Sequence, residues 1–180
     1  MSHSNQKSVA ILATDGFEQS ELLEPKRALE QAGFNVDVIS LQAGKIIGWD
    51  KNDWGEQVSV DLTLDNAYAS QYQALVLPGG LINPDTLRQH KAAIEFVRAF
   101  SEYGDKRPIA AICHGPWLLA EANIVEGKRL TSFASIQTDL KNAGAQWVDE
   151  QVVQDDNVIT SRTPADLEAF NNRLIQAISA

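Results

Sequence analysis

The sequence is poor in cysteine and histidine: it holds one cysteine, Cys113, and three histidines in 180 residues. A single cysteine excludes an internal disulfide and any metal site built from several thiolates. A lone thiol suits a reducing compartment, so we expect a cytoplasmic protein. His3 lies in a short polar stretch at the N-terminus, which leaves histidine-dependent chemistry to His90 or His114.

Long apolar runs and an excess of positive charge are also missing. No apolar stretch approaches the roughly 20 residues of a membrane-spanning helix, and residues 1–7 lack the apolar centre of a secretory signal. The chain carries 15 basic and 24 acidic residues, a formal net charge of -9. Such a surface repels phosphate backbones and anionic lipids, so we expect neither nucleic acid nor membrane as a partner.

The length and the 44% apolar content suit one domain with its own core. We expect a flexible leader at residues 1–7 and a single domain at residues 8–180. We find no internal repeat, low-complexity tract or linker.

Short apolar segments alternate with segments of helical pattern. Strands are expected at residues 8–14, 34–41, 74–77 and 108–112, and helices at 18–32, 84–103, 117–123 and 163–178. The helical segment at 84–103 is expected to have a joint near His90. Pro25 is expected to interrupt the first helix or to open its second half. Residues 58–64 alternate like a half-exposed strand or hairpin arm, and residues 152–159 like a hairpin. This order predicts an α/β fold, a flavodoxin-like three-layer sandwich around a mostly parallel sheet.

In such a fold, functional residues gather just beyond the carboxyl ends of the strands. Cys113 occupies that place, after a buried strand and before a helix with Gly115 and Pro116 at its start. A lone cysteine is more often a small core residue, but the strand–turn–helix setting is that of a nucleophile elbow. A helix N-terminus favours the thiolate, so we predict a Cys113 pKa below the usual value of about 8.5.

The neighbouring strand ends supply further candidates. Gly79 and Gly80 can bring backbone amides close to a ligand as an oxyanion hole, or form a plain tight turn. Glu18 is expected over the sulfur with a raised pKa, although it and Glu21 can equally be solvated charges at a helix start. His114 is either a general acid or base or a half-buried histidine. No phosphate-binding fingerprint is present, and we expect no metal and no organic cofactor.

Four segments together resemble one family: DGFEQSEL at 15–22, LVLPGG at 75–80, AICHGP at 111–116 and SRTPADL at 161–167. They are similar to the DJ-1/PfpI superfamily, on its PfpI (intracellular protease-like) branch, from residue 8 onward. The resemblance implies that Cys113 is the reactive cysteine and Glu18 its carboxyl partner. It also implies an oxyanion pocket from amides near Gly80 and His114. It further implies that Asp85 reaches a histidine of a neighbouring subunit, which requires a homo-oligomer, a dimer or hexamer.

The same resemblance implies peptidase, glyoxalase, deglycase, chaperone-like or oxidative-stress-sensing roles. We predict a cofactor-independent stress-protection enzyme whose cysteine attacks a small reactive aldehyde, such as methylglyoxal, or a modified protein that carries its adduct. Two alternatives stay open at this stage. One is an intracellular cysteine peptidase, and the other is a non-enzymatic sensor or chaperone that acts through oxidation of Cys113.

Overall fold

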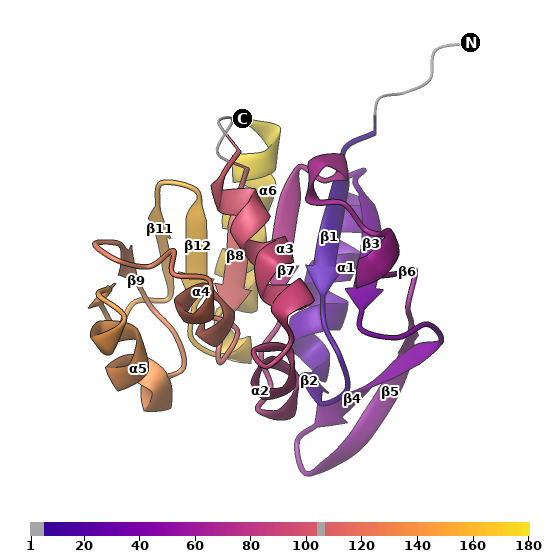
Figure 1. The fold of residues 1–180 in the computed structure, drawn as a ribbon, viewed down its shortest axis with the longest axis horizontal. Helices are drawn as coiled ribbons and strands as arrows, with labels where there is room; N and C mark the ends of the chain where they lie inside the picture. The colour runs from indigo at the N-terminus through magenta and orange to yellow at the C-terminus, as the bar shows by residue number, and fades with distance from the viewer. Residues whose placement is uncertain (1–5, 104–106) are drawn as a thin grey trace.

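The computed structural model describes residues 6–103 and 107–180, and its centre is a seven-stranded sheet in the order β11-β12-β8-β7-β1-β3-β6 (Figure 1). The strands are β1 Ser8–Leu12, β3 Asn35–Ser40, β6 Leu62–Thr63, β7 Ala74–Leu77, β8 Ile109–Ile112, β11 Val152–Asp155 and β12 Val158–Ser161. All neighbouring strands pair parallel except β11 and β12, which form the expected antiparallel hairpin. The order β3-β1-β7-β8-β12 is that of a flavodoxin-like sheet, as predicted.

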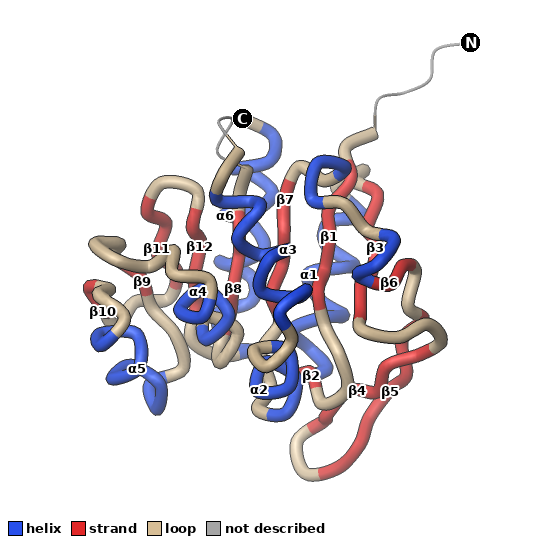
Figure 2. Tube along the Cα trace, in the orientation of Figure 1, coloured by secondary structure: helices blue, strands red, loops and turns tan. Residues whose placement is uncertain are grey.

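Six helices and four short 3-10 helices surround the described sheet (Figure 2). The α-helices are α1 Gln19–Gln31, α2 Ile82–Leu87, α3 Lys91–Ser101, α4 Trp117–Glu121, α5 Gln137–Asn142 and α6 Leu167–Ser179. The 3-10 helices are η1 Leu64–Asn66, η2 Ala69–Gln71, η3 Ala134–Ile136 and η4 Pro164–Asp166.

Two hydrophobic cores confirm the three layers. Along β1, Val9 and Ile11 join the core formed with α1 and α6, while Ala10 and Leu12 join the core formed with α3 and α4. Because both faces of the sheet are covered, the central strands β7 and β8 are apolar at every position instead of alternating.

Two smaller sheets lie at the edges of the sandwich. The hairpin of β4 (Lys45–Asp50) and β5 (Asp53–Ser59) extends away from the main sheet and pairs with β2 (Phe17–Glu18) (Figure 1). Strands β9 (Arg129–Leu130) and β10 (Gln146–Trp147) form the other sheet. The sequence patterns did not indicate β9, α5 or β10, because strands of two residues and a helix of six are too short for a clear periodic signal.

Some helix boundaries differ from those predicted. Helix α1 runs unbroken through Pro25, which is buried against the core, so the predicted interruption is wrong. A proline removes only its own donor, and packing can hold the helix across that gap. The helical segment predicted at 84–103 is two helices, and the expected joint near His90 is confirmed, since His90 is the N-cap of α3.

The expected leader at residues 1–7 lies largely outside the described residues. Its last two members are tied to the domain, because Gln6 donates a hydrogen bond to the carbonyl of Gly33 (2.9 Å) and Lys7 to that of Ile178 (2.7 Å). Across residues 6–103 and 107–180, no helix has both the length and the apolarity needed to cross a membrane.

Candidate active site

Cys113 forms a sharp elbow directly after β8. Its φ is 64°, a left-handed conformation that residues other than glycine rarely adopt. The backbone is held on both sides, since the Cys113 N–H donates to Ser161 O (3.1 Å) and the Phe133 N–H donates to Cys113 O (2.8 Å). Strained backbone of this kind persists where surrounding contacts fix it, and it concentrates at functional sites. The predicted nucleophile elbow is therefore present, with Cys113 only 8% exposed.

Two backbone N–H groups, those of His114 and Gly80, donate toward the sulfur and lower the Cys113 pKa. Gly80 has a φ of +79°, and a Cβ on it would lie 2.3 Å from the carbonyl oxygen of Gly16. A Cβ on Gly79 would lie 2.7 Å from Cys113 Cβ. Gly79 thus lets the loop after β7 lie against the cysteine, and Gly80 lets the same loop lie against the backbone at Gly16.

Glu21, on the first turn of α1, is hydrogen-bonded to the loop after β7. It is fully buried, and its Oε1 accepts the Gly79 N–H at 2.9 Å. Its Oε2 makes no hydrogen bond of acceptable geometry within the described part of the chain. Burial, and then the charge of Glu18, raise the pKa of Glu21 to about 8, although the contacts with Gly79 and Cys113 lower it. Glu21 is therefore largely protonated at neutral pH.

Glu18, the predicted carboxyl partner, takes a different position. It lies in β2, where burial and the charge of Asp50 raise its pKa and a hydrogen bond with Ser20 lowers it. Its charge is the weakest influence on the Cys113 pKa. The assignment of Glu18 from the resemblance stays a prediction. Glu21 is the carboxyl group that bonds the loop after β7, because α1 turns it toward Gly79.

One signal in the sequence could have identified Glu21. It falls on the buried stripe of α1 with Leu22, Pro25 and Leu29. A carboxyl group on the apolar stripe of a helix is rarely tolerated unless it has a partner.

His114 lies beside the sulfur, with Nδ1 3.3 Å from Cys113 Sγ and Nε2 3.4 Å from Ser135 Oγ. Its ring stacks on Phe133, with centroids 4.8 Å apart, and meets Trp117 edge-on at 5.1 Å. Burial lowers the His114 pKa, so the imidazole is neutral at pH 7 and can accept a proton. Phe133 and Ser135 carried no recognisable signal in the sequence, since they follow a two-residue strand.

The predicted lowering of the Cys113 pKa is wrong. Burial raises it, and the charge of Glu21 raises it further, while the N–H groups of His114 and Gly80 only partly offset these effects. Helix α4 begins at Trp117 and has five residues, so its dipole is small and starts a full turn beyond the sulfur.

Asp85 lies on α2 and is exposed. Within the described residues of one chain its carboxyl makes no hydrogen bond to His114. Leu81 and Ile82, at the start of the same helix, have large apolar side chains with exposed fractions of 60% and 43%.

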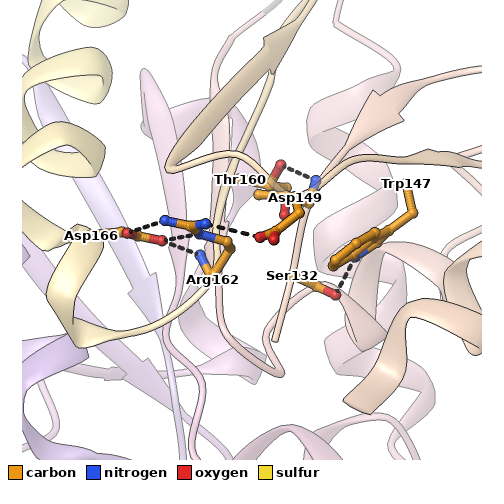
Figure 3. A network of polar contacts seen from close by, with 7 residues as sticks. Ser132, Trp147, Asp149, Thr160, Arg162 and Asp166 are labelled. Carbon is orange, nitrogen blue, oxygen red and sulfur yellow. Dashed lines mark hydrogen bonds and ion pairs between the residues drawn. The ribbon is translucent and has the colours of Figure 1, made fainter. Parts of the chain in front are cut away.

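An ion-pair network fixes the segment after β12, next to the elbow (Figure 3). Arg162 Nε and Nη2 donate to the two carboxylate oxygens of the buried Asp166 at 2.9 and 3.0 Å, and Nη1 donates to Asp149 at 2.8 Å. The same Asp166 accepts the Arg162 backbone N–H at 2.9 Å. The neighbouring Ser161 carbonyl, which accepts the Cys113 N–H, is thereby held in place.

A cavity of about 530 Å³ lies elsewhere, at the ends of β1 and β3, and His90 is among its lining residues while Cys113 is not. His90 is thus separated from the elbow. No group of three or more metal-ligating side chains is found in residues 6–103 and 107–180.

The chain matches the DJ-1/PfpI family over residues 7–177. It is 43% identical over 172 residues to YraA of Bacillus subtilis, described as a candidate cysteine protease, covering 96% of this chain and 98% of that protein. It is 41% identical over 175 residues to protein/nucleic acid deglycase 2 of Escherichia coli, covering 97% and 99%. A two-domain protein of Anabaena variabilis with DJ-1/ThiJ/PfpI-like and ferritin-like domains superposes with a TM-score of 0.90 at 36% identity, covering 97% of this chain and 48% of that longer one. With the elbow and the sheet order, these likenesses show that the chain belongs to the DJ-1/PfpI family.

Proposed function

We propose that this protein is a cofactor-independent enzyme that uses Cys113 to convert reactive carbonyls, methylglyoxal or its early protein adducts, into harmless products. One observation carries the proposal: a strained, single cysteine lies in contact with His114 and beside the buried carboxyl of Glu21. Deglycase and cysteine-protease names among relatives at about 40% identity support a cysteine-dependent reaction.

The reaction with methylglyoxal uses each of these groups. The Cys113 thiol passes its proton to the neutral His114, and the thiolate attacks the aldehyde carbon to form a C–S bond. The carbonyl oxygen becomes an oxyanion that the N–H groups of Gly80 and His114 are placed to stabilise. That oxygen then takes the proton held by His114, which gives a hemithioacetal.

Glu21 performs the next step. A carboxyl with a pKa of about 8 exchanges protons readily near neutrality. In its ionised form it removes the proton from the carbon bonded to sulfur and returns it to the neighbouring carbon. His114 meanwhile transfers the hydroxyl proton of the first carbon to the carbonyl oxygen of the second. This converts the hemithioacetal into a thioester of lactate without any net oxidation. Water then hydrolyses the thioester, which releases lactate and the free thiol.

The exposure of the site favours a small aldehyde over an extended peptide. Cys113 is 8% exposed, and the aromatic rings of Phe133 and Trp117 enclose His114. A peptide substrate needs a groove or a free sheet edge next to the nucleophile.

The proposal also covers the compartment and the binding partners of the enzyme. The free thiol suits the reducing cytoplasm. The net charge of -9 makes nucleic acid a poor partner, even though a relative is named for it. The exposed Asp85 beside Leu81 and Ile82 suits an interface between copies of this chain, in which Asp85 orients His114 of the next subunit.

The test compares the wild-type protein with Cys113→Ser on methylglyoxal and on casein. We expect lactate from methylglyoxal, at least a hundredfold less with the variant, because a serine hydroxyl without a strong base is a poor nucleophile. Casein cleavage that depends on Cys113, without lactate formation, would establish the peptidase instead. If neither activity appears but mild peroxide gives a stable sulfinate at Cys113, the protein is a sensor.

A further inference from the structure

The loop after β7 presents two consecutive peptide groups to the reactive pair. The N–H of Gly79 donates to Glu21 Oε1 at 2.9 Å. The N–H of Gly80, one peptide further on, donates toward the Cys113 sulfur. The orientation of these two peptide planes therefore sets the hydrogen bonds that both catalytic side chains receive.

The opposite sides of the same two peptides are bound by one side chain, Asn83. Its Nδ2 donates to the carbonyl oxygens of Pro78 and Gly79, each at 3.0 Å. Its Oδ1 accepts the backbone N–H of Thr14, at the end of β1, at 2.8 Å. Asn83 is fully buried. Both amide hydrogens and the amide oxygen have partners, and a flipped amide would set its oxygen against two carbonyl oxygens, so the orientation is unambiguous.

A trans peptide links these two sets of bonds. Its C=O and N–H point in opposite directions, so a donor that fixes the carbonyl also aims the amide. Hydrogen bonds in series also polarise one another, so that a bound carbonyl makes its N–H a better donor. The Glu18 N–H also reaches the Gly79 carbonyl, at 3.3 Å, but no other described side chain bonds both carbonyls.

We propose that Asn83 is a positioning residue of the active site, which holds the peptides at Gly79 and Gly80 so that their N–H groups point at Glu21 and Cys113. The expected effect of Asn83 on turnover rests on the proposed function. The expected effect of Asn83 on the reactivity of the Cys113 sulfur does not, because alkylation needs no substrate of the enzyme.

The test measures alkylation of Cys113 by iodoacetamide as a function of pH in the full-length protein. Cys113 is the only cysteine, so the reaction reports on one site. Asn83→Ala removes all three hydrogen bonds. Asn83→Asp keeps the size and the acceptor for Thr14 but loses both donors. Asn157→Ala is the matched control, since Asn157 is buried and donates to the Arg107 carbonyl, at the other end of β8.

Both Asn83 variants are expected to shift the alkylation midpoint to higher pH. At pH 7.5 the rate should fall roughly tenfold, because losing a hydrogen bond to an ionised group shifts a pKa by about one unit. At pH values above the midpoint the rates should converge. The control variant should lower the melting temperature without moving the midpoint. With methylglyoxal, the Asn83 variants should lose kcat more than they raise KM.

Two results overturn the proposal. One is an Asn83 variant that folds, as judged by circular dichroism, and alkylates with the wild-type pH profile. The other is an equal shift in Asn157→Ala, which would mean that the sulfur reports only general loosening. If Asn83→Ala and Asn83→Asp do not fold, Asn83→Ser, which keeps one donor, is read by the same criteria. If the wild-type protein does not convert methylglyoxal, the proposed reaction is refuted. The alkylation rates of the Asn83 variants would still test the role of Asn83, because they do not depend on that reaction.

Discussion

Glu21 controls the site at the level of single residues, because its charge state decides whether it supports or opposes the thiolate. Well below pH 8 the carboxyl is protonated and its O–H can donate to the sulfur. Well above pH 8 it is ionised, and its charge raises the Cys113 pKa. Glu21 therefore stabilises the Cys113 thiolate at pH values below its own pKa and destabilises the thiolate at pH values above it.

This reversal is testable with Glu21→Gln, whose amide is a weaker donor and never carries charge. We expect Cys113 of the variant to react with iodoacetamide more slowly than the wild type at pH 6.5, by roughly threefold or more. At pH 9 it should react at least as fast. Glu18→Gln, which changes the weakest contribution, should leave the profile nearly unchanged. A Glu21→Gln effect that is the same at both pH values would contradict this role.

The raised pKa of Glu21 also makes stability depend on pH. The carboxyl titrates near 4.5 when unfolded and near 8 when folded, so the folded state binds more protons between these values. Raising the pH through this window therefore destabilises the fold. The melting temperature of Glu21→Gln minus that of the wild type should therefore be larger at pH 8.5 than at pH 5. The difference should reach roughly 10 °C, because a pKa of about 8 against 4.5 corresponds to about 4 kcal/mol and each kcal/mol to about 3 °C. Thermal melting followed by circular dichroism measures the difference, and parallel curves for the two proteins would refute it.

At the level of elements, the loops that follow strands place the chemistry, and each is fixed by a contact outside its own segment. The loop after β7 is held by Asn83 and Glu21, and the elbow after β8 by Ser161 of β12. The segment after β12 is in turn fixed by Arg162 and Asp166 (Figure 3).

Asp166→Asn should therefore destabilise the protein much more than Asp149→Asn. Asp166 is 3% exposed and accepts three hydrogen bonds from Arg162, so its loss is expected to lower the free energy of unfolding by about 3 kcal/mol. Asp149 has a side chain that is 72% exposed, and its single ion pair should contribute at most about 1 kcal/mol. Urea denaturation of both variants measures this, and equal losses would show that the pairing with Asp166 has no special weight.

At the level of the whole molecule, no carboxylate among the described residues bonds His114, and we propose that a second copy of the chain supplies one. His114 contacts Ser135 and two aromatic rings, and Asp85 lies on the exposed α2. If a second copy supplies Asp85, the active form is at least a dimer.

Sedimentation velocity at assay concentration should then show an oligomer, and Leu81→Glu should dissociate it because a charge replaces an exposed apolar side chain. Asp85→Asn should keep the oligomer and lower kcat by about tenfold or more, as expected for loss of a group that orients a histidine. Asp65→Asn, a change of an acid on a different surface, serves as the control. A fully active monomer, or an Asp85→Asn variant with an unchanged rate, would remove this part of the proposal.

The amino-acid pattern is sufficient to specify the architecture and the strand ends that meet at the elbow. Short apolar strands alternating with helices specify a parallel sheet, and the carboxyl ends of parallel strands meet at one edge. That alone brings Cys113, His114 and the glycines at 79 and 80 together, although more than 30 residues separate them. The elbow and the glycine loop follow from local backbone requirements, which a sequence pattern records.

The electrostatics of the site and the hydrogen-bond partners of its side chains depend on the packing of distant segments. Glu18 and Glu21 have the same chemistry and lie three residues apart, and the packing of α1 against the loop after β7 selects Glu21. The direction of the Cys113 pKa was likewise set by burial rather than by the short helix that follows it. Asn83 gains its role from two carbonyls and from a β1 amide 69 residues earlier in the chain. Desolvation and hydrogen bonding depend on which distant segments exclude water from a group, and a local pattern holds no record of that.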